Sequence, residues 1–249
     1  MDVYKYIREK RASGPLHFTL IDPDKQKPEE SAEMAAKAQE YGSDAIMVGG
    51  SHAAQMEFLD DCVKKIKERV DIPVILFPSS HAGVSRYADA LFFMSLFNSR
   101  SPQYIVGEQM KGAVLVKDFG LEPLPMVYLI IESGTMTTAA YASDVLPIPR
   151  DKPEFAMGYS LEAKYFGMKF TYLEAGSGAK ETVPTEMIAG VRKTIGDDMM
   201  IIVGGGMRNP EAALEKVKAG ADIIVTGTIA EDDEESFRKI IKAIKNIND

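Results

Sequence analysis

The stretch MMIIVGGGMRNPEAALEKVKAGADIIVTGT, residues 199–228, contains the whole repeating unit of this chain. An apolar run ends in glycines, an amphipathic stretch follows, and a second apolar run again ends in glycine. Continuously apolar runs are typical of parallel strands that are covered on both faces. Asn209 and Pro210 indicate the start of the intervening helix, and Gly220 indicates its end. The stretch is therefore predicted to form a strand, a helix and a parallel strand.

The same alternation runs through the rest of the chain, with strand starts roughly 30 residues apart, the length of one strand-helix unit. Eight strands are predicted, at residues 17–22, 44–50, 73–77, 88–96, 125–131, 169–176, 199–205 and 221–227. Strict alternation eight times over predicts an α/β fold, a (β/α)₈ TIM barrel that forms a single domain over residues 1–249. An open doubly wound sheet is the competing fold.

Helical patterns fill the intervals between the predicted strands. Residues 28–42 repeat small apolar side chains at helical spacing and stop at Gly42, which suits the end of a helix. Residues 232–247 place acids in the first turn and lysines later, which matches the helix dipole. One connection, at 132–152, is long, and long barrel loops often form lids or substrate walls.

The composition narrows the class of protein. The net charge of −8, from 37 acidic and 29 basic residues, argues against general nucleic-acid binding, which uses clustered Lys and Arg. The single cysteine, Cys62, excludes an internal disulfide framework and is interpreted as a packing residue. The N-terminal stretch has no apolar core typical of a secretory signal, and no apolar run is long enough to span a membrane. A cytoplasmic protein is predicted.

Small and polar residues follow nearly every predicted strand, and function gathers at the strand carboxyl ends of a barrel. The glycine-rich segments after the last three strands are the sharpest signal, because glycine lets backbone N–H groups approach a phosphate closely. TGTIAED, at 226–232, also predicts a short extra helix after the last strand. A phosphate site at this end of the barrel is therefore predicted, with ordinary turn glycines as the alternative.

Three polar residues at the strand ends suit the chemistry of a phosphate ester. Asp22 ends the first strand, where a carboxylate is a suitable ligand for Mg²⁺, and Ser51 follows the second strand and offers a further oxygen. Glu174 lies beside the predicted phosphate site and is a candidate acceptor of a substrate hydroxyl proton. The alternatives are an N-cap or salt bridge for Asp22, a plain turn residue for Ser51 and a structural ion pair for Glu174.

Other residues have weaker functional interpretations. The three histidines, His17, His52 and His81, are too scattered for a zinc pattern and are interpreted as structural or rim residues. Arg100 is a candidate contact for an anionic group, with a surface role as the alternative. A cluster of apolar side chains is interpreted as core by default or as an apolar groove leading from the mouth: Phe92, Phe93, Leu96, Phe97, Tyr104, Tyr128, Met136 and Tyr141.

Six motifs, in order along the chain, resemble the geranylgeranylglyceryl phosphate synthase family: LIDPDK (20–25), DAIMVGGS (44–51), SLFNSR (95–100), KFTYLEAGSGA (169–179), IIVGGGMRNPEAA (201–213) and ADIIVTGTIAED (221–232). The LIDPDK and YLEAGSG motifs are similar to those of the larger subgroup of that family. The related bacterial heptaprenylglyceryl phosphate synthases carry a lysine two residues before the first aspartate. Leu20 stands there in this chain, which argues against that branch.

The resemblance implies a prenyltransferase that joins the 3-hydroxyl of sn-glycerol 1-phosphate to C1 of geranylgeranyl diphosphate with loss of diphosphate. It also implies a homo-oligomer, and the lipid product makes transient contact with a membrane surface an expectation. By the family pattern, Asp22 and Ser51 bind Mg²⁺, Asp22 and Glu174 are catalytic, and Glu174 contacts the glycerol hydroxyls. The residues expected to bind glycerol phosphate are Tyr172, Leu173, Glu174, Ala175, Gly176, Ser177, Gly178, Gly204, Gly205, Gly227 and Thr228.

Three alternatives stay open at the level of sequence. One is a prenylglyceryl phosphate synthase of different chain length, for example heptaprenyl, because chain-length preference depends on the depth of the groove, which a few side chains set. A phosphosugar isomerase or synthase would share the phosphate glycines and would use a paired acid and base. A non-catalytic phosphate-binding barrel would need neither Asp22 nor Mg²⁺.

Overall fold

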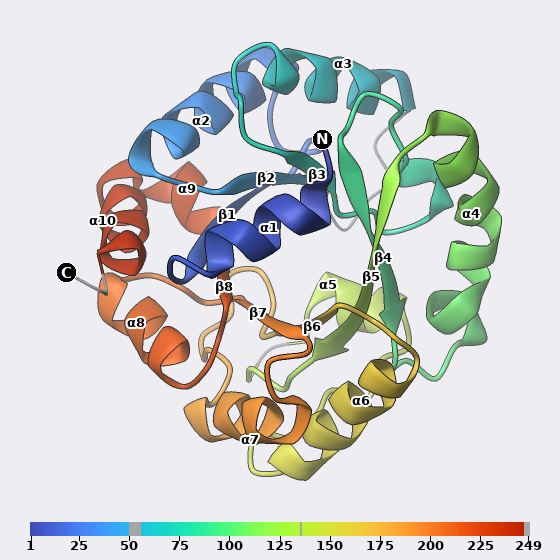
Figure 1. Ribbon diagram of the computed structural model, residues 1–249, viewed down its shortest axis with the longest axis vertical. Helices are drawn as coiled ribbons and strands as arrows, with labels where there is room; N and C mark the ends of the chain where they lie inside the picture. The colour runs from blue at the N-terminus through green and yellow to red at the C-terminus, as the bar shows by residue number, and fades with distance from the viewer. Residues whose placement is uncertain (50–55, 135, 247–249) are drawn as a thin grey trace.

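The computed structural model describes residues 1–49, 56–134 and 136–246, and within them eight parallel strands close into a barrel in sequence order. Figure 1 looks along the barrel, with the helices arranged around it. The predicted TIM barrel is confirmed, and the open doubly wound sheet is excluded. The strands are β1 Leu16–Ile21, β2 Ala45–Val48, β3 Val74–Leu76, β4 Ala90–Leu96, β5 Glu122–Ile130, β6 Phe170–Glu174, β7 Met200–Gly204 and β8 Ile223–Thr226.

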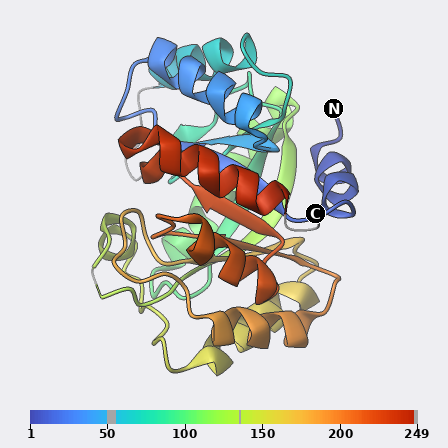
Figure 2. The ribbon, with the colours of Figure 1, turned by 90° about the vertical axis from the view of Figure 1, so that its left-hand side faces the viewer.

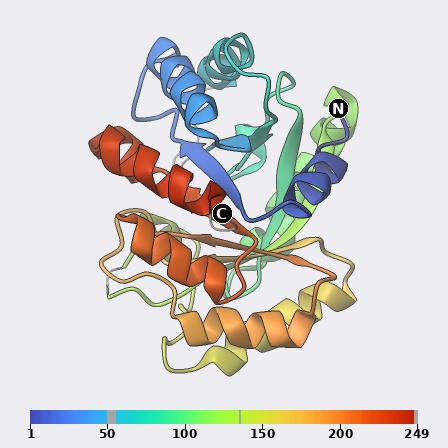
Figure 3. The ribbon, with the colours of Figure 1, turned by 60° about the vertical axis from the view of Figure 1, so that its left-hand side comes forward.

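The helices follow the strands around the outside, and Figure 3 shows α2, α10, α8 and α7 side by side along the barrel wall. Two short helices besides these, η1 at His81–Gly83 and the π-helix η2 at Gln103–Gly107, lie near the mouth. The α-helices are α1 Val3–Arg11, α2 Pro28–Tyr41, α3 Met56–Lys67, α4 Glu108–Phe119, α5 Thr138–Ala142, α6 Pro153–Tyr165, α7 Thr185–Ile195, α8 Pro210–Lys218, α9 Thr228–Asp232 and α10 Glu234–Lys245.

The helix signals in the sequence correspond to real caps. Gly42 ends α2 in the left-handed conformation, with φ of +109°. The Asn209 side chain accepts a hydrogen bond from the Ala212 N–H at the start of α8. The short extra helix predicted after the last strand is α9, and α5 lies within the long connection at 132–152.

Strand β5 begins at Glu122, three residues before the predicted start at Pro125. The added segment contains Pro123, and proline cannot donate a strand hydrogen bond. Both prolines are in register with β4, opposite Leu91 and Phe93, but the pairing of β5 with β6 begins only at Met126, so on that side both prolines lie before the start of β6. Their missing N–H groups therefore cost little there, and the strand runs further than the pattern indicated.

The amino end of the barrel is closed by α1, which lies across the barrel centre in Figure 1 and outside the ring of helices in Figure 2. Val3 and Ile7 are fully buried and pack in the same cluster as Phe18, Phe92 and the other inward-facing side chains. Both carboxylate oxygens of Glu122 accept backbone N–H groups of α1, from Val3 at 2.6 Å and from Tyr4 at 2.9 Å. This end of the barrel is therefore a packed core.

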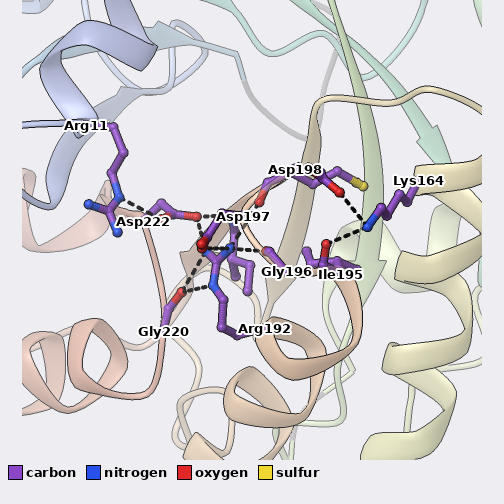
Figure 4. A network of polar contacts seen from close by, with 11 residues as sticks. Arg11, Lys164, Arg192, Ile195, Gly196, Asp197, Asp198, Gly220 and Asp222 are labelled. Carbon is purple, nitrogen blue, oxygen red and sulfur yellow. Dashed lines mark hydrogen bonds and ion pairs between the residues drawn. The ribbon is translucent and has the colours of Figure 1, made fainter.

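Aspartates at the starts of three strands repeat one arrangement at this amino end. Each accepts the backbone N–H of a residue on the preceding strand and also contacts a cationic side chain. Figure 4 shows the Asp222 network, in which Arg192 and Arg11 both reach the carboxylate. The pairs are Asp44 with the His17 N–H and Lys245, Asp89 with the Val74 N–H and Lys67, and Asp222 with the Ile201 N–H and Arg192.

Candidate functional site

A cavity of about 960 Å³ occupies the carboxyl end of the barrel and extends sideways over β3 and β4 to α4. This volume is within the range of sites for small molecules and cofactors. Its polar part, the polar mouth, is lined by Asp22, Glu174, Ser177, Gly205, Gly227 and Thr228. Its apolar part, the apolar groove, is lined by Val84, Leu91, Phe93, Met94, Gly112 and Val116. One cavity therefore joins two chemically different regions.

Three aromatic rings separate the polar mouth from the packed core below it. Phe77, Tyr128 and Tyr172 all line the cavity, and their ring centroids lie 5.2 to 5.6 Å apart. Burial, followed by the negative charge of Glu174, raises the pKa of both tyrosine hydroxyls well above 10. Both hydroxyls therefore stay protonated and can act as hydrogen-bond donors. Phe77 is a part of this floor that the sequence did not single out.

Glu174 is the last residue of β6, and only 9% of it is exposed. Its Oε1 accepts the Gly176 N–H at 2.5 Å, and its carboxylate also accepts the Tyr172 hydroxyl. Burial raises the pKa of Glu174, and these two hydrogen bonds only partly oppose that effect. A carboxylate with a raised pKa is a stronger base, so Glu174 suits the role of a proton acceptor.

The glycines after β7 have a second function besides opening the backbone to a ligand. A Cβ on Gly204 would overlap the Tyr172 hydroxyl, and a Cβ on Gly205 would lie 2.6 Å from Oε1 of Glu174. Gly205 also has a φ of +88°, which side-chain-bearing residues rarely adopt. Glycine at these positions therefore leaves room for the Glu174 carboxylate.

The three glycine-rich segments predicted to form a phosphate site do meet. β6 pairs with β7 and β7 with β8, which brings their ends to one edge. The hydroxyls of Ser177 and Thr228 lie 2.8 Å apart and join the first and last of these segments. Gly178, with φ of +68°, lies in the same loop as Ser177 and lines the cavity.

Two residues of the predicted set turn their side chains away. Leu173 and Ala175 are fully buried in the cluster between the barrel and its helices, because successive strand residues face opposite sides. The N–H of Ala175 already donates to the Gly204 carbonyl at 3.1 Å. Neither residue offers a side chain to the cavity.

Asp22 lies directly after β1, half-buried, and lines the polar mouth with Lys25. Its Oδ1 accepts the Asp24 N–H at 3.1 Å. Ser51, the second predicted metal ligand, and His52 lie outside the described residues. Within the described ranges no group of three or more His, Cys, Asp or Glu side chains is placed to hold a metal. A single carboxylate fits Mg²⁺, which commonly takes one or two protein carboxylates together with substrate phosphates and waters.

The aromatic cluster divides between the cavity and other surroundings. Phe92, Phe93, Leu96, Tyr104, Tyr128 and Met136 line the cavity, as the groove hypothesis expected. Phe97 instead packs against Tyr159 and Phe166, with ring centroids 6.5 and 6.0 Å away. Tyr141 is 82% exposed and does not line the cavity. The groove interpretation is therefore wrong for Phe97 and Tyr141, because Phe97 faces the helices outside the barrel and Tyr141 faces solvent.

The basic residues of the cavity differ from the one that the sequence suggested. Arg100 is largely exposed, pairs with Asp144 at 2.5 Å and does not line the cavity. Lys25 and Arg208 do line it, and Lys25 lies 3.2 Å from Glu231 of α9. Both residues stand inside motifs already recognised, DPDK and GGGMRN. Their positions directly after β1 and β7 could therefore have predicted from the sequence that both residues line the cavity.

The other two described histidine positions fit structural and rim roles. His17 is fully buried between β1 and the helices, where its ring contacts the Ser43 and Thr226 hydroxyls at 3.1 and 2.8 Å. Burial, with the charge of Lys245, lowers the pKa of His17 to about 3. His81 lies at the edge of the cavity, with Nδ1 2.7 Å from Glu108.

Comparison with known proteins gives a consistent result over nearly the whole chain. The PcrB family model matches residues 4–247. The chain is 52% identical over 246 residues to the geranylgeranylglyceryl phosphate synthase of Pyrococcus horikoshii, covering 98% of this chain and 95% of the relative. It is 49% identical over 240 residues to the synthase of Methanosphaera stadtmanae, covering 96% of this chain and 97% of the relative.

One solved structure of a protein with similar sequence contains a bound substrate. It is the (S)-3-O-geranylgeranylglyceryl phosphate synthase of Thermoplasma acidophilum in complex with its substrate sn-glycerol-1-phosphate. The two chains superpose with a TM-score of 0.93 at 42% identity, and the match covers 99% of each.

Proposed function

The chain belongs to the PcrB family of geranylgeranylglyceryl phosphate synthases, prenyltransferases of archaeal lipid biosynthesis, and on that basis we propose how its barrel mouth carries out the transfer. The reaction joins the 3-hydroxyl of sn-glycerol 1-phosphate to a geranylgeranyl group and releases diphosphate. Family membership thus separates this activity from the phosphosugar and non-catalytic alternatives. The carrying observation is the single cavity that joins the polar mouth to the apolar groove.

Glycerol phosphate binds in the polar mouth in this proposal. Ser177 and Thr228 offer hydroxyl groups to the phosphate, and the backbone at Gly205 and Gly227 allows close approach. The phosphate thereby places the glycerol hydroxyls beside Glu174. The relative that binds sn-glycerol-1-phosphate supports this placement, because it shares the fold and 42% of the sequence.

The prenyl diphosphate binds with its tail in the apolar groove between β4 and α4. Burial of each CH₂-sized unit contributes about 0.8 kcal/mol, so a long tail gains considerable binding free energy there. Asp22 and Lys25 line the polar mouth of the same cavity, where they would meet the diphosphate. Asp22, with Ser51, would hold Mg²⁺, and the lysine offers a positive charge to the same group.

The residues of the chain move one proton in this scheme. Glu174 accepts the proton of the 3-hydroxyl as that oxygen forms a bond to C1 of the prenyl group. The bond between C1 and the diphosphate oxygen breaks, and its electron pair leaves with the diphosphate. Mg²⁺, when bound, supplies charge neutralisation for that leaving group. Because an allylic C1 can develop positive charge, the carboxylate of Glu174 is a sufficient base.

The proposal also covers the location of the protein in the cell, its oligomeric state and its contact with membranes. Among the described residues, none of the helices has the length and apolar character needed to cross a bilayer. We propose a cytoplasmic enzyme that forms a homo-oligomer, as the family resemblance implies, and that touches a membrane surface transiently to release its lipid product.

One assay tests the proposed function directly. The protein is incubated with radiolabelled sn-glycerol 1-phosphate, Mg²⁺ and prenyl diphosphates of several chain lengths, and organic-extractable label is measured. We expect label with the geranylgeranyl donor, and its absence at every chain length would contradict the activity. Undiminished product from Asp22→Ala would contradict only the assignment of Asp22 as the metal ligand.

A further inference from the structure

A buried carboxylate stands beside the apolar groove, away from the polar mouth. Glu108, the first residue of α4, is 9% exposed and lines the cavity. One of its oxygens, Oε2, accepts the backbone N–H of His81 at 2.9 Å and lies 2.7 Å from the ring Nδ1 of the same residue. The other, Oε1, accepts from Gln103 at 3.0 Å and from Lys111 at 3.1 Å. Both oxygens are therefore satisfied.

The partners of Glu108 come from two segments that are distant in the chain. His81 belongs to η1, which follows β3, whereas Gln103 and Lys111 belong to η2 and α4. Gly112 of α4 lies against the Cβ of His81, where an added Cβ would be 3.7 Å away. Glu108 thus connects the two segments that form the outer wall of the groove.

The same wall is attached to β4 by two other side chains. The Gln109 amide donates to the Met94 carbonyl at 2.5 Å and to the Tyr104 carbonyl at 3.1 Å. The Ser95 hydroxyl donates to the Ile105 carbonyl. These bonds hold η2, a π-helix, and short π-helical turns are frequent at functional sites. Side-chain hydrogen bonds therefore set where this wall stands relative to β4.

The charge on Glu108 is part of this arrangement. Burial by itself raises the pKa of Glu108, but the hydrogen bonds from His81, Lys111 and Gln103 outweigh it and bring the pKa to about 2. The side chain is therefore ionised at neutral pH. A buried charge is costly unless it is fully hydrogen-bonded, so loss of one partner disturbs the whole set.

We propose that Glu108 is a positioning residue for the prenyl substrate, because it fixes η1 against α4 and so sets the width of the apolar groove. It touches none of the reacting atoms. Its effect is on which prenyl chains bind and how tightly, and the inference rests on the proposed function of the groove.

The test is the Glu108→Gln variant, which keeps the shape but replaces one acceptor oxygen with an NH₂ group that faces other donors. We expect KM for geranylgeranyl diphosphate to rise about tenfold, equivalent to about 1.4 kcal/mol. KM for sn-glycerol 1-phosphate should stay the same within about twofold, equivalent to about 0.4 kcal/mol. The relative rates with shorter and longer prenyl diphosphates should become more even, because a looser wall discriminates less.

Glu122→Gln is the matched control at the opposite end of the barrel. The Glu122 carboxylate also accepts two hydrogen bonds across elements, from the Val3 and Tyr4 N–H groups, but it lies at the amino end of β5 and does not line the cavity. Its replacement should lower Tm and leave both KM values and the chain-length profile unchanged. The contrast separates positioning from general stability.

Gln103→Ala is the second variant, in case Glu108→Gln folds poorly. It removes one exposed donor to Glu108 and should raise KM for geranylgeranyl diphosphate in the same direction by a smaller factor. A folded Glu108→Gln or Gln103→Ala with an unchanged prenyl KM and profile would overturn the inference. So would equal rises in both KM values. A wild-type protein that makes no lipid from any prenyl diphosphate would instead refute the proposed function.

Discussion

Three aspartates at the amino end of the barrel and two carboxylates in the polar mouth at its carboxyl end differ in their partners. At the amino end, Asp44, Asp89 and Asp222 each accept a backbone N–H and each contact a lysine or arginine. At the carboxyl end, Asp22 and Glu174 also accept backbone N–H groups, but neither forms an ion pair with any described residue. Their charges are therefore compensated within the protein at one end and left for a ligand at the other.

This difference in partners predicts which carboxylates contribute to the stability of the fold and which contribute to activity. A buried charge that loses its partner destabilises the fold. A charge that awaits a metal or substrate costs stability in the free protein and acts only in the complex. Substitutions of the three amino-end aspartates should therefore lower stability and spare activity, whereas substitutions of Asp22 and Glu174 should lower activity without lowering stability.

Asp22→Asn should have the largest effect, a fall in kcat of about a thousandfold, or about 4 kcal/mol of barrier. Asparagine keeps the acceptor for the Asp24 N–H but removes the charge proposed to hold Mg²⁺. The measurement is kcat over a titration of Mg²⁺, with Tm measured in parallel. A variant with near wild-type kcat at saturating Mg²⁺ would break the comparison at this end.

Asp222→Asn makes the same chemical change at the amino end. It removes the charge shared by Arg192 and Arg11, so the free energy of unfolding should fall by about 3 kcal/mol. Both KM values and kcat at a temperature well below Tm should match those of the wild type. Urea denaturation gives the stability, and a loss of activity without loss of stability would contradict the assignment.

Glu174→Gln should lower kcat about thirtyfold, or about 2 kcal/mol, less than Asp22→Asn because the allylic carbon does not need a strong base. The raised pKa of Glu174 means that the wild-type rate falls as pH drops through a value above the usual 4.5, where the carboxylate takes up its proton.

The same shift predicts a gain in stability for the Glu174→Gln variant. In the unfolded chain Glu174 ionises near pH 4.5, whereas in the folded protein burial disfavours its ionised form. The free energy of unfolding of the wild type therefore falls as the pH rises from 4.5 through the raised pKa of Glu174. At pH 7 the variant should therefore be at least as stable as the wild type. The pH profiles of kcat and urea denaturation of both proteins measure the two effects. A less active and clearly less stable variant would argue for a structural carboxylate.

The last prediction concerns the pH dependence of stability that His17 causes, and its sign follows from the pKa of His17, about 3 against the usual 6.5. Below pH 6.5 the unfolded chain binds a proton that the buried ring does not, so stability falls as the pH drops from 6.5 toward 3. At pH 5 the loss should be about 2 kcal/mol. His17→Gln should lose that much less between pH 7 and pH 5 in urea denaturation, and equal losses would show that His17 does not cause the slope.

The sequence predicted most of the barrel because its local signals agree with the tertiary structure. These signals depend on only a few neighbouring residues. They are the apolar runs, the caps at Gly42 and Asn209 and the glycines at the strand ends. Strand β5 shows the limit of local patterns. Pro123 and Pro125 are tolerated because β6 begins later, and the length of a neighbouring strand is absent from the local pattern.

The sequence by itself determined the alternation of strands and helices, the polar strand ends and the family motifs, because each depends on residues close together in the chain. Only the tertiary structure decided that Phe97 and Tyr141 do not line the groove, that Lys25 and Arg208 line the cavity in place of Arg100, and that Glu108 joins η1 to α4 in the groove wall. The physical reason is that such contacts depend on which faces meet in the folded barrel, and residues far apart in sequence set those faces.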